Sequence, residues 1–340
     1  MIKQDIFIEK NIELGMKNTL HKIFHPIEDD LKAFDTHFKE IMSSDIRLVD
    51  EVAKYLVKHK GKQFRPALLL VSARSVGEPN RDTYVTAAVV ELLHTATLIH
   101  DDVIDDAELR RGFLTIHKIW KNKIAILMGD YLLAKSLIAA TETGSLDIMN
   151  TVATVAKRLI KGEIFEIQKA RKLDITEEDY FRMIADKTAS LISACCELGA
   201  LTVHATDEQR EALRQFGEYL GIAFQIKDDL LDYESNSGIL GKPALADLKD
   251  KKITLPLLYA FQSSPEEQRK KIVKMIRNGK VKKEVDYILK FVDDHQGLQK
   301  AREKAEDIKN RAIESLSILP DSPAKNVLET LADFVINRKN

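Results

Sequence analysis

The chain has 340 residues, with 52 Lys and Arg against 53 Asp and Glu and a formal net charge of -1 at pH 7. This balance argues against a general nucleic-acid-binding protein, whose affinity comes largely from neutralising phosphates. Apolar residues make up 44% of the chain, enough for a substantial core, whereas only 14 Gly and 8 Pro are present. So few turn-forming residues disfavour sandwiches and barrels and predict a mostly helical protein.

The first hundred residues predict a series of helices. Residues 1–40 carry apolar side chains at loose helical spacing that Pro26 interrupts. Apolar positions then recur every three to four residues, which predicts three further helices, over 45–58, 66–76 and 82–106. We expect Gly77 to Asn80 to form the loop between the last two helices.

Capping signals mark helix ends in the rest of the chain. One helix is expected to start at Thr206, which Gln209 would complete as a capping box. Two more are expected at Ser264 and Ser322, each a capping serine followed by proline. The pair Asn278-Gly279 is expected to end a helix. No alternating stretch of four to eight residues predicts a strand, and no repeat or linker is evident. We therefore expect one all-helical domain over 1–340, with an N-terminal helical segment at about 1–40.

The two cysteines and the apolar runs bear on location. Cys195 and Cys196 are adjacent, a spacing that suits neither a disulfide nor a shared metal ion, so we expect two small core or surface residues. The first residues, MIKQDIFIEKN, lack the apolar core of a signal peptide. No apolar run approaches the roughly 20 residues that cross a bilayer. We expect no transmembrane segment and a cytoplasmic location, with peripheral membrane contact for product release left open.

A run of aspartates, His100-Asp101-Asp102-Val103-Ile104-Asp105-Asp106, ends the long apolar segment. Asp disfavours helices, and like charges four residues apart repel each other. Because residues four apart share a helix face, the Asp101 and Asp105 carboxylates are expected side by side. The apolar flanks predict a largely buried helix, where carboxylates must be paired or bind cations. A solvated acidic face is the alternative.

A second cluster, Asp228-Asp229-Leu230-Leu231-Asp232, repeats this spacing after another apolar run. Two such clusters on apolar helices make solvated faces the poorer interpretation. Oxygen ligands without His or Cys favour a hard cation, and so few carboxylates favour Mg²⁺, with Mn²⁺ as the alternative ion. Since Mg²⁺ completes its shell with water and phosphate oxygens, the two clusters together predict a polyphosphate substrate.

Basic residues accompany both clusters. Arg110 and Arg111 follow the first cluster directly, and the segment 61–66, GKQFRP, stands at a predicted helix start. Further candidates are Lys187, Lys227, Lys242 and Lys252, although each alone could be a surface cation. Arg and Lys bind phosphate oxygens. No Gly-rich phosphate loop is present, so a lipid-like diphosphate fits this aliphatic helical chain better than a nucleotide does.

At these residues the sequence resembles the polyprenyl synthetase family, the trans-isoprenyl diphosphate synthases. The matching blocks occur in family order and are GKQFRP at 61–66, ELLHTATLIHDDVIDDAELRRG at 91–112, MGDYLLA at 128–134, KGE at 161–163, DKTASL at 186–191, GIAFQIKDDLLDY at 221–233 and GKPALADLKDKKITLPL at 241–257. The resemblance implies a single large antiparallel all-α bundle around a central cavity, and a homodimer.

The resemblance also implies the reaction. An allylic diphosphate would ionise with the help of Mg²⁺, isopentenyl diphosphate would attack the allylic cation, and the released diphosphate would take up the proton. The implied metal ligands are Asp101, Asp105 and Asp228, with Asp102, Asp229 and Asp232 completing or orienting the shells.

The resemblance assigns the other contacts to three groups. Isopentenyl diphosphate would be bound by Lys62, Arg65, His94 and Arg111. The allylic diphosphate would be bound by Arg110, Lys187, Lys242 and Lys252. Thr188 and Gln225 would lie beside the forming cation. Without the resemblance, His94 would be interpreted as a core histidine.

Three positions depart from the family pattern. Family members usually have Gly where Leu245 and Lys251 stand, and commonly Gln where Glu166 stands. These positions lie near the phosphate-covering loop and the cavity, so the departures bear on loop closure and local charge. The intact aspartates and Arg pair argue against a non-catalytic partner subunit.

Product length is predicted from the residues before Asp101. Ala96, Thr97 and Leu93 are expected to line the wall along which the product grows, and short-chain enzymes often place Phe or Tyr at 96 or 97. Because both are small here, we expect an all-trans product of C25 or longer. Alternatives are a short-chain farnesyl or geranylgeranyl diphosphate synthase, a class I terpene cyclase and a non-catalytic subunit.

Overall fold

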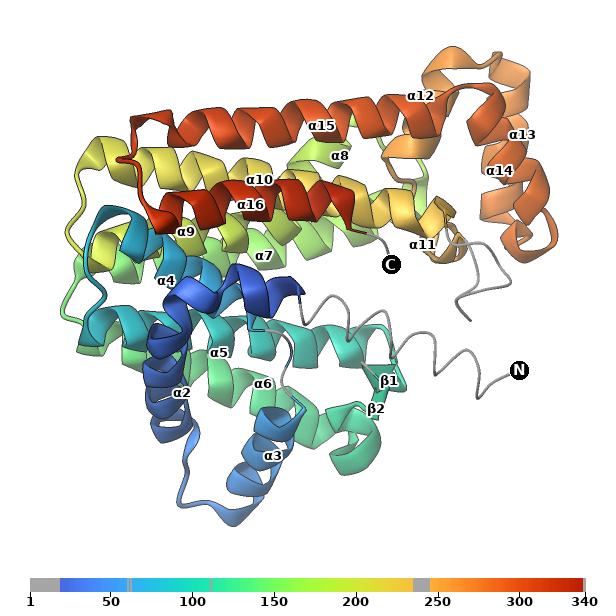
Figure 1. The fold of residues 1–340 in the computed structure, drawn as a ribbon. Coiled ribbons are helices and arrows are strands. Elements are labelled where there is room, and N and C mark those ends of the chain that lie inside the picture. Colours follow the sequence, from blue (N-terminus) through green and yellow to red (C-terminus); the bar gives the residue numbers. More distant parts are fainter. Residues whose placement is uncertain (1–18, 60, 62, 111, 235–244, 339–340) are drawn as a thin grey trace.

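The computed structural model describes residues 19–59, 61, 63–110, 112–234 and 245–338, and this part is almost entirely helical (Figure 1). Residues 19–23 are helical, and the elements that follow are η1 (His25–Ile27), α2 (Glu28–Met42), α3 (Arg47–Lys58), α4 (Phe64–Val76), α5 (Arg81–Ile104), β1 (Leu109–Arg110), β2 (Phe113–Leu114), α6 (Ile116–Glu142), α7 (Leu146–Lys172), α8 (Glu177–Ile184), the π-helical turn η2 (Ala185–Ala189), α9 (Ser190–Thr202), α10 (Asp207–Glu234), α11 (Ala246–Lys249), α12 (Leu255–Ser263), α13 (Glu266–Arg277), η3 (Val281–Lys283), α14 (Val285–Asp294), α15 (Gly297–Ser315), η4 (Leu316–Ile318) and α16 (Pro323–Asn337).

The core is built around helices that are apolar on all sides. α4, α5 and α9 bury side chains around most of their circumference, as expected of helices with no polar face. α5 packs along α6, α4 against α9, and α9 against α10, which in turn carries α15. Figure 1 shows α10, α15 and α16 on one side of the molecule and α5 and α6 on the other. The predicted all-α bundle is confirmed.

Two apolar clusters fill the interior, and α10 contributes to both. Its first half, with Phe216 and Leu220, belongs to the cluster around α4, α5 and α9. Its second half, with Ile226 and Leu230, packs with α12, α14 and α15. The second aspartate cluster, at 228–232, lies within this second half of α10.

The long helix α5 ends earlier than the sequence predicts. It stops at Ile104, whose side chain is 59% exposed, instead of continuing to residue 106. Asp106 adopts a left-handed φ of 49°, which a right-handed helix cannot accommodate and which Asp tolerates better than most residues. The prediction of a largely buried cluster is therefore wrong for its last residues, although Asp102 is buried.

A short antiparallel ribbon follows α5, where no strand is predicted. β1 pairs with β2 in the register Leu109 with Leu114 and Arg110 with Phe113. The turn contains Gly112, whose φ of 77° is easily adopted only by glycine. The ribbon reverses the chain directly after the first aspartate cluster and so holds Arg110 beside it.

Most predicted helix ends are confirmed, and one is wrong. Thr206 and Gln209 form reciprocal hydrogen bonds, Ser322 caps α16, and Asn278 ends α13. Ser264 does not cap α13, because Pro265 has an extended ψ of 145° and the helix starts only at Glu266. The Ser264 hydroxyl donates instead to the carbonyl of Phe261.

The helix α6 is more apolar than the sequence analysis predicts. Of the helices in the described part of the chain, it alone is long and apolar enough to cross a membrane. In the fold, 39% of its apolar 18-residue stretch is buried. One side of α6 packs along α5. The other carries exposed apolar residues, which are Ile126, Leu127, Leu137 and Ile138. Cys195 and Cys196 are free and buried, so of the two expected placements, core or surface, the core is the one observed.

Candidate active site

The segment DKTASL is held between two helices that approach it closely. A Cβ atom on Gly162 of α7 would lie 2.6 Å from the backbone nitrogen of Lys187, and one on Gly221 of α10 would lie 2.5 Å from the Cα of Ala189. Both distances are too short for any other residue. The segment forms the π-helical turn η2, a geometry found frequently at functional sites. The two glycines thus let η2 carry Lys187 into the space between α7 and α10.

Lys187 lies in a network of two lysines and two glutamates. Its Nζ atom is 2.7 Å from Glu163 and 2.9 Å from Glu166, and Lys252 Nζ is 2.8 Å from the same Glu166 oxygen. Burial works against charge on both partners, yet the carboxylates raise the pKa of Lys187 and the two lysines hold the pKa of Glu166 below its usual value. Glu166 likewise raises the pKa of Lys252, so Lys187, Lys252 and Glu166 are charged.

Asp101 faces this network from the end of α5. Burial raises the pKa of Asp101 to about 6; Glu163 and Asp105 add to the rise, while Lys187 and Arg110 oppose it. Asp105 is exposed just beyond the helix, and its backbone N–H still bonds the carbonyl of Asp101 at 2.8 Å. This bond keeps the helical backbone geometry between Asp101 and Asp105 although the helix ends at Ile104.

Asp102, the second aspartate of the first motif, is buried and pairs with Arg110. Its carboxylate is 5% exposed and accepts hydrogen bonds from Nε of Arg110 at 2.8 Å and from Nη2 at 2.7 Å. Because a buried carboxylate needs such a partner, the ribbon that returns Arg110 to α5 is part of the site. Asp102 and Arg110 therefore form a pair that fixes the end of α5.

The three aspartates of the second motif have different partners. Asp228 is 42% exposed in its side chain and pairs with Arg338, which follows α16. Asp229 is buried and accepts hydrogen bonds from Tyr180 at 2.6 Å and Gln225 at 2.9 Å. Asp232 accepts the backbone N–H groups of residues 246 and 247 at the start of α11.

The polar pair predicted beside the forming cation is connected to Asp229. Thr188 donates to Gln225 Oε1 at 2.9 Å, and Gln225 in turn donates to Asp229. Since the amide can satisfy both partners only in one orientation, this chain fixes its oxygen toward η2. Thr188, Gln225 and Asp229 thus behave as one hydrogen-bonded unit between η2 and α10.

A separate small cavity of about 100 Å³ brings His94, predicted for isopentenyl diphosphate, together with Asp102 and Arg110, predicted for the metal and the allylic diphosphate. Its lining also includes Gly61. Arg65 donates from Nη1 to His94 Nε2 at 2.9 Å, which makes that ring nitrogen the acceptor. The other predicted diphosphate contacts, Lys62, Arg111 and Lys242, lie outside the described residues.

Sequence reasoning missed two contributors to the site. Tyr180 precedes η2 and contacts an aspartate 49 positions later, and Arg338 contacts one 110 positions earlier. Neither residue lies in a block that marks a site, so no local signal could have found it. Lys227, a weaker candidate, lies 3.9 Å from Glu234 on its own helix.

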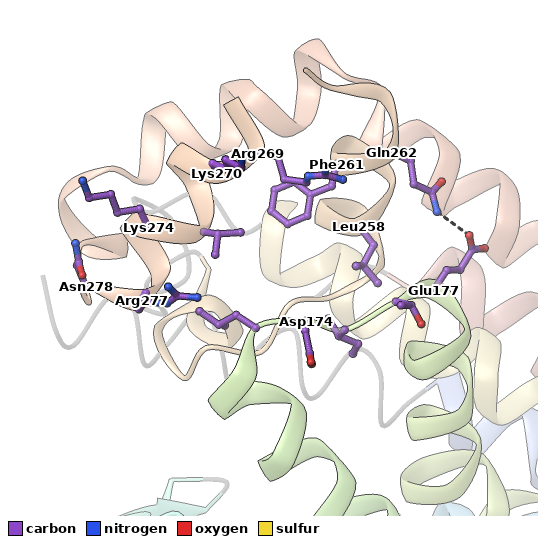
Figure 2. Close-up of a pocket in the computed structure, with 14 residues that line it drawn as sticks. Asp174, Glu177, Leu258, Phe261, Gln262, Arg269, Lys270, Lys274, Arg277 and Asn278 are labelled. Carbon is purple, nitrogen blue, oxygen red and sulfur yellow. Dashed lines mark hydrogen bonds between the residues drawn. The ribbon is translucent and has the colours of Figure 1, made fainter. Parts of the chain in front are cut away.

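Figure 2 shows a larger cavity, of about 840 Å³, between α12, α13 and the segment that joins α7 to α8. Leu258 and Phe261 contribute apolar surface, and Gln262 bonds Glu177 at 2.9 Å. The predicted site residues that the structure describes do not line this cavity. The convergence of charged groups, and not cavity size, therefore locates the candidate active site.

Comparison with known proteins identifies the family. The family model described as "Polyprenyl synthetase" matches residues 46–292, which is more than two thirds of the chain. The chain belongs to the polyprenyl synthetase family. It is 34% identical to octaprenyl diphosphate synthase of Escherichia coli over 94% of this chain and 99% of that protein.

Two solved structures of this family resemble the chain along most of its length. A decaprenyl diphosphate synthase from Rhodobacter capsulatus is 36% identical with a TM-score of 0.88, covering 93% of this chain and 98% of the other. A polyprenyl synthase from Caulobacter crescentus, complexed with calcium and isoprenyl diphosphate, is 31% identical with a TM-score of 0.85, covering 94% and 97%. The predicted family and fold are confirmed.

The carboxylates fit the divalent metal that a polyprenyl synthetase uses. Among the described residues, no three His, Cys, Asp or Glu side chains lie together as a closed metal site. Asp101, Asp105 and Asp228 are nevertheless hard oxygen donors, the type that Mg²⁺ prefers, and Asp105 and Asp228 are exposed enough to be reached. Mg²⁺ usually takes one or two carboxylates and completes its shell with water and phosphate.

The proposed product wall of this polyprenyl synthetase lies on α5. Ala96 and Leu93 are each 2% exposed, and Thr97 is half-buried one turn before Asp101. The Thr97 hydroxyl donates to the carbonyl of His94 at 2.8 Å. On the next helix Leu132 is buried, whereas Leu137 is 40% exposed and lies on the surface of the single chain.

Proposed function

We propose that this polyprenyl synthetase is a trans-prenyltransferase that condenses isopentenyl diphosphate with an allylic diphosphate to give an all-trans polyprenyl diphosphate of C25 or longer. The supporting observation is the convergence of Asp101 with the Lys187 and Lys252 network between α5, α7 and η2. Carboxylates and ammonium groups placed together suit a metal-bound diphosphate better than a neutral substrate.

The chain's own residues bind and orient the allylic substrate. Lys187 and Lys252 hold oxygens of its diphosphate as point charges, and Arg110, which pairs with Asp102 next to Asp101, contributes further guanidinium donors. Asp101, Asp105 and Asp228 hold Mg²⁺, with Mn²⁺ as the alternative ion. When bound, these ions neutralise charge on the leaving diphosphate.

The remaining groups stabilise and direct the carbon skeleton. Thr188 and Gln225 present oxygens to the positive charge that develops when the allylic diphosphate leaves, because their hydrogen-bonded chain to Asp229 fixes the amide. Isopentenyl diphosphate binds near Arg65 and His94, together with Lys62 and Arg111. The proton lost after the new bond forms passes to the released diphosphate, so no side chain need act as a base.

Product length follows from the small wall residues. Ala96 and Thr97 leave room for a chain that continues past the first turn below Asp101, whereas a short-chain farnesyl or geranylgeranyl synthase needs a bulky floor. That short-chain activity is the alternative within the same reaction class. A class I terpene cyclase is less consistent with the second DDxxD motif at 228–232 and with the Arg65–His94 pair.

The experiment that separates these activities follows incorporation of labelled isopentenyl diphosphate by the purified chain. We expect incorporation that requires both an allylic primer and Mg²⁺. Cyclic hydrocarbon formed from the primer alone would identify a cyclase, and no turnover of either substrate would identify a non-catalytic subunit.

We also propose that the chain is a single domain over 1–340 and a cytoplasmic homodimer joined through α6. The exposed residues Leu127 and Ile138 lie on its outer side, and Ile160 and Ile164 of α7 extend the apolar area. Exposed apolar patches of this kind mark protein interfaces, and peripheral membrane contact for product release is the competing use. Light scattering should give a dimer that Ile138→Glu converts to a monomer.

A further inference from the structure

Glu166 of α7 joins the two lysines that the proposed function assigns to the allylic diphosphate. A single oxygen, Oε1, accepts Lys187 Nζ at 2.9 Å and Lys252 Nζ at 2.8 Å. The two lysines come from distant parts of the chain, η2 and the segment after α11. The Glu166 side chain is 11% exposed.

The charge on Glu166 is what allows this arrangement. Two ammonium groups that share one oxygen lie close together and repel each other, and burial strengthens that repulsion because water screens it less. Lys187 has a second partner in Glu163 at 2.7 Å, whereas the ion pair of Lys252 in this network is with Glu166 alone. The carboxylate therefore keeps both lysines charged and adjacent while no substrate is bound.

Glu166 Oε1 occupies the place at Lys187 and Lys252 that a diphosphate oxygen would take. A diphosphate oxygen offers the lysines the same contacts that Glu166 Oε1 makes, with more negative charge. A ligand bound there must displace those contacts and then lies beside a buried carboxylate, whose negative charge repels it.

We propose that Glu166 is a positioning residue that sets the affinity of this site for diphosphates: it holds Lys187 and Lys252 in place before binding and weakens retention of the diphosphate afterwards. This inference rests on the proposed function. Its consequence for turnover is faster release of the inorganic pyrophosphate that each condensation leaves in the site. A glutamine at position 166 would keep the size of the side chain and remove the repulsion.

Calorimetric titration of the full chain with inorganic pyrophosphate, at saturating Mg²⁺ and without the second substrate, tests this directly. Glu166→Gln should lower the Kd for pyrophosphate about tenfold, because it removes one negative charge beside the bound anion. Glu166→Asp keeps that charge and should stay close to the wild type. Glu163→Gln, which frees only Lys187, should tighten binding by a smaller factor.

Two further variants separate this inference from the function on which it rests. Lys187→Gln and Lys252→Gln should each weaken pyrophosphate binding if the site holds the diphosphate. Weakening by both, with unchanged or weaker binding in Glu166→Gln, would overturn the role of Glu166 and leave the proposed function intact. If neither lysine variant changes the Kd, the diphosphate site itself is misplaced. Should Glu166→Gln fold poorly, the comparison of Glu163→Gln with the wild type decides the same question.

Discussion

Arg338 and Asp228 form an ion pair that ties the end of α16 to the second aspartate motif. The guanidinium also lies 3.9 Å from the Phe224 ring and donates to the carbonyl of that residue at 3.1 Å. Burial lowers the pKa of Arg338, and the facing Asp228 counteracts this. The aspartate proposed as a metal ligand therefore has a cationic partner within the chain itself.

A metal that binds Asp228 has to compete with this pair. Arg338→Gln should therefore raise the affinity for Mn²⁺, measured by electron paramagnetic resonance of the free ion, by a factor of several. Arg302→Gln is the matched control, because Arg302 pairs with Glu234 of the same helix at 2.8 Å. Equal Mn²⁺ affinity in wild type and Arg338→Gln would show that the pair persists in the metal-bound protein.

Substitutions in the two aspartate motifs should lower turnover much more than a substitution of a neighbouring acidic residue. Asp101→Asn or Asp228→Asn should lower kcat at least about 10²-fold, since a contact to developing charge is worth several kcal/mol. Asp106→Asn should change kcat little, because Asp106 is exposed and pairs with Lys118 at 2.7 Å. Steady-state rates with excess EDTA should fall to background; full activity in EDTA would exclude a metal-dependent reaction.

Lys251 should be a position where glycine stabilises the protein. Its φ of 63° is left-handed, which is unfavourable for residues with a Cβ atom, and its side chain is exposed. Lys251→Gly should therefore raise the free energy of unfolding by about 0.5 kcal/mol, after the greater freedom of glycine in the unfolded chain is subtracted. Chemical denaturation measures the change.

The control for that change is Lys280→Gly. Lys280 is also an exposed lysine in a loop, but its φ is -88°, so glycine relieves no strain there. We expect a loss of about 0.5 kcal/mol at this position. A loss of similar size at Lys251 would mean that the left-handed geometry costs nothing.

A bulky residue in the proposed wall should shorten the product. Ala96→Tyr should cut the main product to about C15–C20, because a phenol ring cannot share an aliphatic tunnel without overpacking. Thr97→Tyr tests the neighbouring half-buried position. Chromatography of dephosphorylated products gives the distribution, and an unchanged distribution in both variants would place the wall elsewhere.

Local patterns predicted much of this structure. Apolar periodicity predicted α3, α4 and α5, and the reciprocal bonds of Thr206 and Gln209 follow from residue types three apart. The failures have local causes as well. Asp106 turns into the left-handed region and ends α5, and the extended Pro265 moves the start of α13 past Ser264. Backbone choices of this kind depend on one residue and leave no periodic signal.

Long-range contacts could not be predicted in the same way. The spacing of Asp228, Asp229 and Asp232 predicted three carboxylates on one helix, but not that each has a different partner. Those partners come from α8, from α11 and from the residue after α16, and only the packed fold brings them together. Likewise, Glu166 was recognised as a departure from the family pattern, while its contacts with two lysines emerged only from the structure.

The decisive measurement is mass analysis of the product that the purified wild-type chain forms from isopentenyl diphosphate and C10, C15 or C20 primers. We expect Mg²⁺-dependent elongation of a primer to all-trans polyprenyl diphosphates of C25 or longer. A product that stops at C15 or C20 would contradict the proposed chain length. The absence of any condensation product from every primer would contradict the proposed reaction itself.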